Sequence, residues 1–77
     1  MNNITSLQNL KEGDKAKVVK LLSEGSIKRR LQDIGVIEGT EIERLQASPT
    51  GDPIAYFIRG AVIALRSEDS TNIIVAQ

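Results

Sequence analysis

Three consecutive basic residues, Lys28, Arg29 and Arg30, form the densest cluster of charge in the chain, within SIKRRLQDIGVIEGT at 26–40. Such a run binds phosphate groups when its side chains share one face, and is otherwise a solvated exterior. Successive residues of a helix are about 100° apart, so the three side chains spread over roughly 200°. This spread favours a solvated helix exterior over a phosphate-binding patch.

Composition excludes several classes of chemistry. Ten Lys and Arg balance ten Asp and Glu, so no global field attracts nucleic acid or anionic lipid. The chain has neither Cys nor His, which removes the thiolate and imidazole ligands of a tight transition-metal site and the usual nucleophile and general base. Glu41 and Glu43 share one strand face as solubilising residues. We expect no enzyme activity, no metal site and no cofactor.

The aromatic residues argue against nucleic-acid binding. Tyr56 and Phe57 are adjacent in an expected strand, so they point to opposite faces and at most one is exposed. Binding to single strands uses several stacked aromatics. A nucleic-acid-binding small barrel therefore remains only as an alternative that rests on fold analogy.

The charged run is expected on a short helix from Ile27 to Ile34. Ser26 is a suitable N-cap, and Gly35 is suited to a left-handed cap after the last turn. Ile27, Leu31 and Ile34 recur at helical spacing and predict a buried stripe.

The rest of the chain has strand character. Strands are expected at Lys15–Leu22, Glu41–Gln46, Ile54–Ile58, Ala61–Arg66 and Asn72–Ala76. Arg59-Gly60 is a tight corner that makes IAYFIRGAVIALR a hairpin, and residues 67–70 form a polar turn. The pattern predicts a mainly β fold, a small SH3-like barrel of about five strands that closes to protect its edges and carries one inserted helix. We expect residues 1–77 to form a single domain.

Turns and core follow from the same pattern. Glycines are expected in turns or caps with positive φ at Gly13, Gly35, Gly39 and Gly60. The apolar positions expected in the core are Val18, Leu31, Ile34, Ile42, Ile63 and Leu65. No secretory signal or membrane-spanning run is visible in the sequence, so we expect a cytoplasmic protein.

Two long segments carry a family resemblance. SIKRRLQDIGVIEGTEIERL, followed by GDPIAYFIRGAVIALRSEDSTNIIV, contains R-L-x-D-x-G-x-x-x-G-T, then GDP, then R-G-x-x-I-A-L-R in this order. The sequence thereby resembles the FeoA family of ferrous iron transport, whose domain also ends iron-dependent repressors. The family often has Pro before Gly in two turns where this chain has Glu12 and Glu38, a change expected to loosen the turns slightly.

The resemblance implies an SH3-like barrel and a cytoplasmic accessory role in ferrous iron uptake, acting on the membrane GTPase-permease FeoB. The membrane is then reached only through this partner. We expect docking through the helix and neighbouring loops, with Lys28, Arg29 and Asp33 on the exposed side of the helix. Arg59 and Arg66 match the family segment R-G-x-x-I-A-L-R and are further candidate partner-binding residues. An alternative interpretation is that the chain is a regulatory fragment that once belonged to such a repressor.

Overall fold

Six antiparallel strands make up most of the chain in the computed structural model, which describes residues 3–77. The strands are β1 (Ile4–Ser6), β2 (Lys15–Leu21), β3 (Glu41–Ala47), β4 (Ile54–Ile58), β5 (Ala61–Leu65) and β6 (Ile73–Ala76). The helical segments are the 3-10 helix η1 (Leu7–Asn9), α1 (Gly25–Asp33) and the single turn α2 (Ser67–Ser70). The predicted mainly β class with one substantial helix is confirmed.

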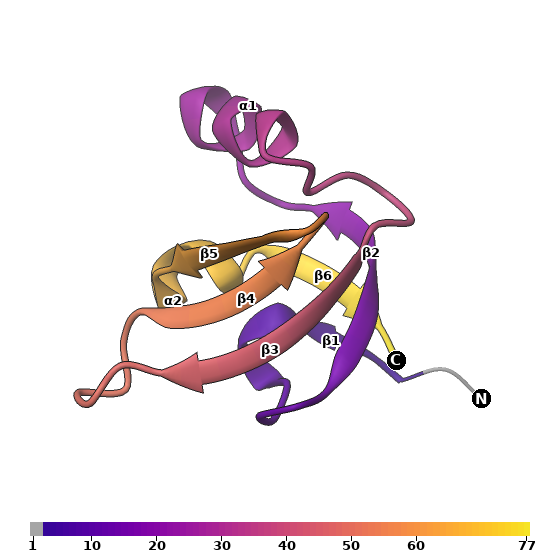
Figure 1. Cartoon of the computed structure of the whole chain (residues 1–77). Coiled ribbons are helices and arrows are strands. Elements are labelled where there is room, and N and C mark those ends of the chain that lie inside the picture. Colours follow the sequence, from indigo (N-terminus) through magenta and orange to yellow (C-terminus); the bar gives the residue numbers. More distant parts are fainter. Residues whose placement is uncertain (1–2) are drawn as a thin grey trace.

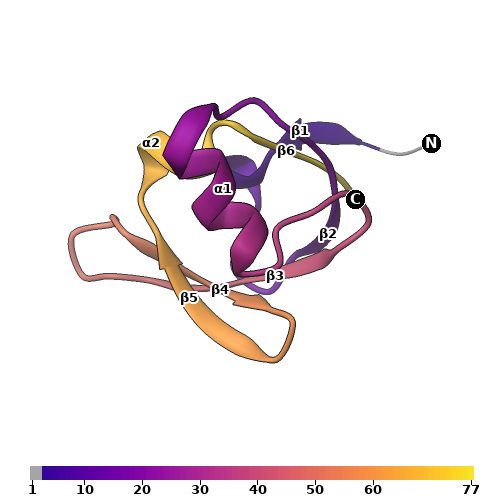
Figure 2. The same ribbon diagram turned by 90° about the horizontal axis from the view of Figure 1, so that it is seen from above.

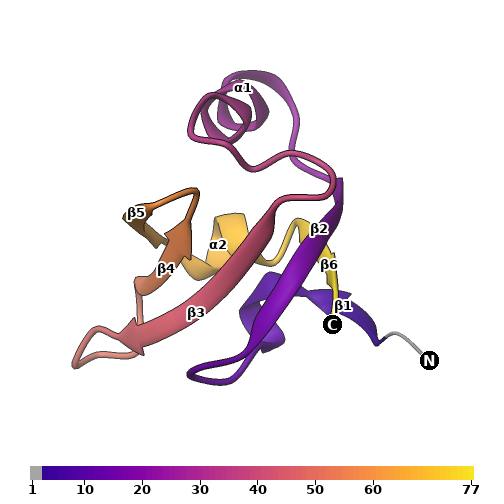
Figure 3. The same cartoon turned by 45° about the vertical axis from the view of Figure 1, so that its right-hand side comes forward.

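The strands form one curled sheet in the order β1-β6-β2-β3-β4-β5, with α1 beyond one end of the curl (Figures 1 and 3). Helix α2 lies on the inner side of the curl, where it contacts η1. Among residues 3–77, β1 and β5 do not pair with each other, so the predicted closing of the barrel is incomplete. The sheet therefore keeps two edges, the short strand β1 and the longer strand β5.

Two elements, one at each end of the chain, differ from the expectation. Ile4–Ser6 is too short to show an alternating pattern, and it becomes a strand by pairing with the far end of the chain, Ile4 opposite Ala76. The segment Ser67–Ser70, expected as a turn, is helical. Strand β1 raises the strand number from about five to six.

Helix α1 also begins earlier than expected. It starts at Gly25 rather than Ile27, and the N-cap position is Glu24, whose side chain makes no capping hydrogen bond. Gly25 has a φ of 64°, and this left-handed conformation lets the chain turn into the helix two residues sooner.

The core lies inside the curl and draws on every strand except β1. Of the expected core residues, Val18, Leu31, Ile42 and Leu65 are buried, while Ile34 and Ile63 are half-buried against them. The remaining buried apolar residues are Leu7, Leu10, Ala16, Val36, Ile54, Tyr56, Ile58, Ile73 and Val75. Leu7 and Leu10 were not predicted because they lie on and beside η1, a helix too short to show periodicity.

Local turns follow the expected chemistry. Arg59 and Gly60 have φ values of 48° and 84°, as a two-residue type I′ turn requires, so the predicted hairpin of β4 and β5 is confirmed. Two further turns have Glu12-Gly13 and Glu38-Gly39 as their central residues. Each turn is closed by a backbone hydrogen bond: Asp14 N–H donates to the Lys11 carbonyl, and Thr40 N–H donates to the Ile37 carbonyl. The family's Pro would occupy the first central position, where its fixed φ suits such turns.

Candidate partner-binding site

Helix α1 stands away from the sheet and rests above the open end of the curl (Figures 1 and 2). Of its nine residues, Leu31 alone is buried in the described structure. The other side chains of the helix are exposed, including those of Lys28, Arg29 and Asp33. The helix therefore presents most of its surface, and most of its charge, to solvent.

The C-terminal end of α1 is fixed by a Schellman motif. Gly35, with a φ of 104°, donates its N–H to the Gln32 carbonyl at 3.0 Å, and Val36 N–H donates to the Leu31 carbonyl at 2.9 Å. Leu31 and Val36 are both buried, which supplies the apolar contact that accompanies this motif. Thr40 Oγ1 adds a bond to the Gly35 carbonyl at 2.8 Å.

Arg59, at the tip of the β4–β5 hairpin, packs over the same glycine. A Cβ atom at position 35 would lie 2.3 Å from Cδ of Arg59, so the arginine stem uses the space that Gly35 leaves open. This contact also places a cation beside the C-terminal end of α1, where a helix favours positive charge. Arg59 thus links the hairpin to the helix.

A groove of about 830 Å³ lies between α1 and the segment that joins β5 to α2. Its apolar part includes Leu22 and Ile27, which are 49% and 47% exposed. Its charged part includes Arg30 from α1 and Arg66 after β5, with acidic side chains around them: Glu24, Glu68 and Asp69. Apolar anchors beside a charged rim are typical of protein-binding surfaces.

Hydrogen bonds hold the walls of this groove. Asp52 Oδ1 accepts the backbone N–H of Ser67 at 2.8 Å and so fixes the first residue of α2. Leu22 N–H donates to the Asn72 carbonyl at 2.7 Å, which joins the segment before α1 to the segment after α2. The groove therefore belongs to the folded framework on both sides.

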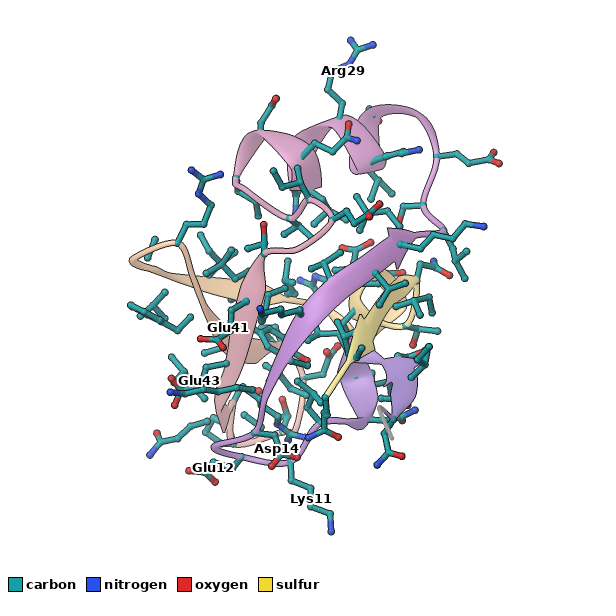
Figure 4. The ribbon with its side chains drawn as sticks, turned by 90° about the vertical axis from the view of Figure 1, so that its right-hand side faces the viewer. Lys11, Glu12, Asp14, Arg29, Glu41 and Glu43 are labelled. Carbon is teal, nitrogen blue, oxygen red and sulfur yellow. The ribbon has the colours of Figure 1, made fainter. Side chains whose placement is uncertain are left out.

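The five candidate partner-binding residues do not form one cluster. Lys28, Arg29 and Asp33 lie on the outside of α1, and Figure 4 shows Arg29 extending from the end of the molecule opposite Lys11. Arg66 lines the groove and Arg59 lies at the hairpin tip. Three of the five thus belong to α1, and the other two lie on segments beside it.

Ile27 departs from the prediction for the helix. It was expected in the buried stripe, but the first turn of α1 projects past the sheet and leaves Ile27 on the groove. Leu22, Ile27 and Arg30 were not among the predicted site residues. An apolar residue in the first turn of a polar helix was the available signal, but helical spacing by itself does not separate a core contact from an exposed one.

A further buried polar group, the phenol of Tyr56, lies inside the curl. Burial raises the pKa of the Tyr56 phenol from its ordinary 10.0, and the neighbouring Ser70 hydroxyl and Arg44 guanidinium offset this only in part. The Tyr56 hydroxyl has no hydrogen-bond partner among the described residues.

Within residues 3–77, no three side chains of His, Cys, Asp or Glu gather in a way that could hold a metal ion. No helix in this range is long and apolar enough to cross a membrane.

Solved structures identify the class of fold. A zinc-complexed FeoA of Stenotrophomonas maltophilia, described as a prokaryotic SH3 domain protein, superposes with a TM-score of 0.82 at 24% identity, covering 92% of this chain and 88% of that one. The FeoA of Chlorobium tepidum superposes with a TM-score of 0.87 at 34% identity, covering 92% of this chain and 68% of that one. The fold is an SH3-like β domain, as predicted.

The FeoA domain family matches residues 5–77, so this chain belongs to the FeoA family. A curated relative is the Fe(2+) transport protein A/Fe(2+) transporter FeoB fusion protein of Porphyromonas gingivalis, 33% identical over 67 residues. The match covers 87% of this chain but 8% of that relative. The family is thereby associated with ferrous iron transport.

Proposed function

We propose that this chain is a cytoplasmic accessory domain of ferrous iron uptake that binds the cytoplasmic part of a FeoB-type transporter and modulates transport. The main support is the fusion relative, in which a FeoA-like segment and a FeoB transporter form one polypeptide. Fusion holds two modules at high effective concentration, an arrangement that suits modules which contact each other.

The proposed docking surface is α1 together with the groove beside it. Its support is the exposure of α1, which rests on the sheet through Leu31, and the presence of Leu22 and Ile27 beside Arg30 and Arg66. Apolar side chains of this kind supply binding energy, while charges at the rim govern association rate and partner choice.

We further propose that the domain performs no chemistry and acts without a metal or cofactor of its own. The sequence has no Cys and no His. Its effect on transport would therefore come from binding alone. Nucleic acid is not expected as a partner, because the consecutive exposed cations of α1 are about 100° apart around the helix axis. Weak retention on DNA without a steep salt dependence would agree with this.

The decisive experiment is an NMR titration of the isotope-labelled chain with the soluble cytoplasmic domain of FeoB from the same genome. Shifts are expected to cluster on residues 22–40 and around Arg66. Lys28→Glu with Arg29→Glu should weaken binding without unfolding the domain. Unchanged affinity in the folded double variant would place the docking surface elsewhere.

A matched pair separates a local charge effect from a general one. Arg29→Glu and Lys11→Glu make the same change of charge at exposed positions, at opposite ends of the molecule (Figure 4). The proposal requires that Arg29→Glu weakens binding more than Lys11→Glu does. Equal effects would indicate long-range attraction rather than contact with α1. The absence of any shift, in every nucleotide state, would contradict binding to the soluble domain.

A further inference from the structure

Strand β5 is an unprotected edge of the sheet. In the described residues it pairs with β4 on one side and with no strand on the other. Its sequence, AVIAL at 61–65, contains no charge and no proline, the usual means by which an edge strand avoids pairing with another chain. The opposite edge, β1, is protected by its length of three residues.

The pairing register shows which backbone groups are free. Ile58 and Ala61 lie opposite each other on the two sides of a two-residue turn, so they form two backbone hydrogen bonds with each other. Along the hairpin, hydrogen-bonded pairs alternate with pairs that are not hydrogen-bonded. Val62 and Ala64 therefore direct their N–H and C=O groups away from β4. Neither residue takes part in a backbone hydrogen bond outside the strand ladders of the described chain. Four backbone groups remain available at this edge.

These groups are arranged symmetrically about Ile63. If two copies of β5 pair antiparallel with Ile63 opposite Ile63, Val62 of each copy lies opposite Ala64 of the other. All four free groups of each strand then find partners. The strand is thus complementary to itself.

The side chains agree with this arrangement. Val62 is 65% exposed and lies opposite Phe57 of β4, which is 42% exposed, so the outer face beside the edge is apolar. Pairing would place Ala64 of the second copy against Val62. The groove lined by Ala64 and Arg66 leaves open space beside the C-terminal end of the edge.

Charge is also complementary in this register. Position 59 of one copy lies opposite position 67 of the other, so the Arg59 turn approaches the start of α2. The first turn of α2 carries Glu68 and Asp69. The chain has a formal net charge of zero, so two copies do not repel each other as a whole.

We propose that β5 is a self-association edge through which two copies of this chain join their sheets in an antiparallel, two-fold arrangement centred on Ile63. The occupant of the edge is a second copy of the chain, and the proposal does not depend on a transporter partner.

The test is the oligomeric state of the full chain, measured by sedimentation velocity over a series of protein concentrations. A concentration-dependent dimer is expected, with slowed hydrogen exchange at the amide N–H groups of Val62 and Ala64 as the dimer forms. A monomer throughout, with both amides unprotected at the highest concentration, would overturn the proposal.

Two substitutions test the edge directly. Ala64→Pro removes an outward N–H without removing a bond to β4, because edge strands tolerate proline at such positions. Since each dimer loses two hydrogen bonds, its dissociation constant should rise by about tenfold or more. Val62→Lys introduces the charge that protected edges carry and should also weaken the dimer.

Val19→Lys is the matched control, because Val19 is a 38% exposed valine on β2, away from β5. It should leave the dimer intact. A dimer that persists equally in Val62→Lys and Ala64→Pro would place the interface elsewhere and overturn the proposal. Folding of each variant is checked by the dispersion of its amide NMR spectrum.

Discussion

Three of the five residues of β4 are buried, Ile54, Tyr56 and Ile58, whereas Leu31 is the one buried residue in the nine of α1 as described. Strand β4 pairs on both sides, with β3 and β5. In the described part of the chain, backbone hydrogen bonds connect α1 to the sheet only through the segments that precede and follow the helix. The two regions therefore carry different roles. The sheet supplies the packing that makes this small chain fold, and the helix supplies exposed surface.

This difference explains how a strongly charged helix is tolerated. A helix of this length is marginal in water by its own propensity and needs tertiary support. Here the support is concentrated in the Leu31 contact and in the Schellman motif at Gly35. The remaining positions of α1 are exposed, so charged side chains there do not disturb the core.

The largest effect is expected in the sheet. Tyr56→Ala should lower the free energy of unfolding by about 3–5 kcal/mol, because it removes the largest fully buried side chain. That loss approaches the whole stability of a domain this small. Urea denaturation and amide dispersion measure it. A folded variant with a nearly unchanged midpoint would mean that β4 does not hold the core together.

The next effect concerns the helix anchor. Leu31→Ala should cost about 2–4 kcal/mol and should speed hydrogen exchange in α1 more than in the sheet. Ile27→Ala is the control on the same helix, and its 47% exposure predicts a much smaller loss. Similar losses for both variants would show that α1 is not held by Leu31.

A smaller effect is expected at the helix cap. Gly35→Ala should lower the free energy of unfolding by about 1–2 kcal/mol, because alanine is strained in the left-handed backbone conformation of this position. The clash of the new Cβ with Arg59 should lower it further. Gly39→Ala is the matched control, since Gly39 has a φ of 90° and no atom near its missing Cβ. Thermal denaturation should show Gly35→Ala as the more destabilising change, and Arg59→Ala should reduce the difference. Equal losses would show that the arginine contact is energetically neutral.

The smallest effect is the pH dependence of Tyr56. Burial raises the pKa of its phenol in the folded state, so its contribution to stability is full below the ordinary pKa of 10.0 and is lost as pH rises above it. Tyr56→Phe should lose less stability than the wild type between neutral and strongly alkaline pH. The chain has one tyrosine, so tyrosinate absorbance reports the ionisation directly. Parallel loss of stability in both proteins would contradict the burial effect.

Local signals predicted much of the fold. The hairpin of β4 and β5 was found because Arg59-Gly60 separates two apolar runs by two residues. The helix was placed within two residues of its true start for a similar reason, since Gly35 marks its end. Turn preferences and side-chain periodicity depend on residues that are close together in the sequence, so the sequence alone is enough to predict the elements that follow from them.

The elements that were missed depend on distant partners. Strand β1 exists because residues 4–6 meet residues 74–76, and η1 and α2 are short segments that contact each other. The same limit applies to the groove. Leu22 and Arg66 are far apart in the sequence, and both line the groove only because the folded sheet brings their two segments close together.

By itself, the sequence determined the mainly β class, the positions of the tight turns, the one substantial helix and the exclusion of thiolate and imidazole chemistry. Each of these depends on residue type or on spacing within a few residues. Tertiary structure alone decided that Ile27 is exposed while Leu31 is buried, that Arg59 packs over Gly35, and that β5 remains an open edge. These features depend on how elements distant in sequence pack together, and no local pattern encodes that geometry.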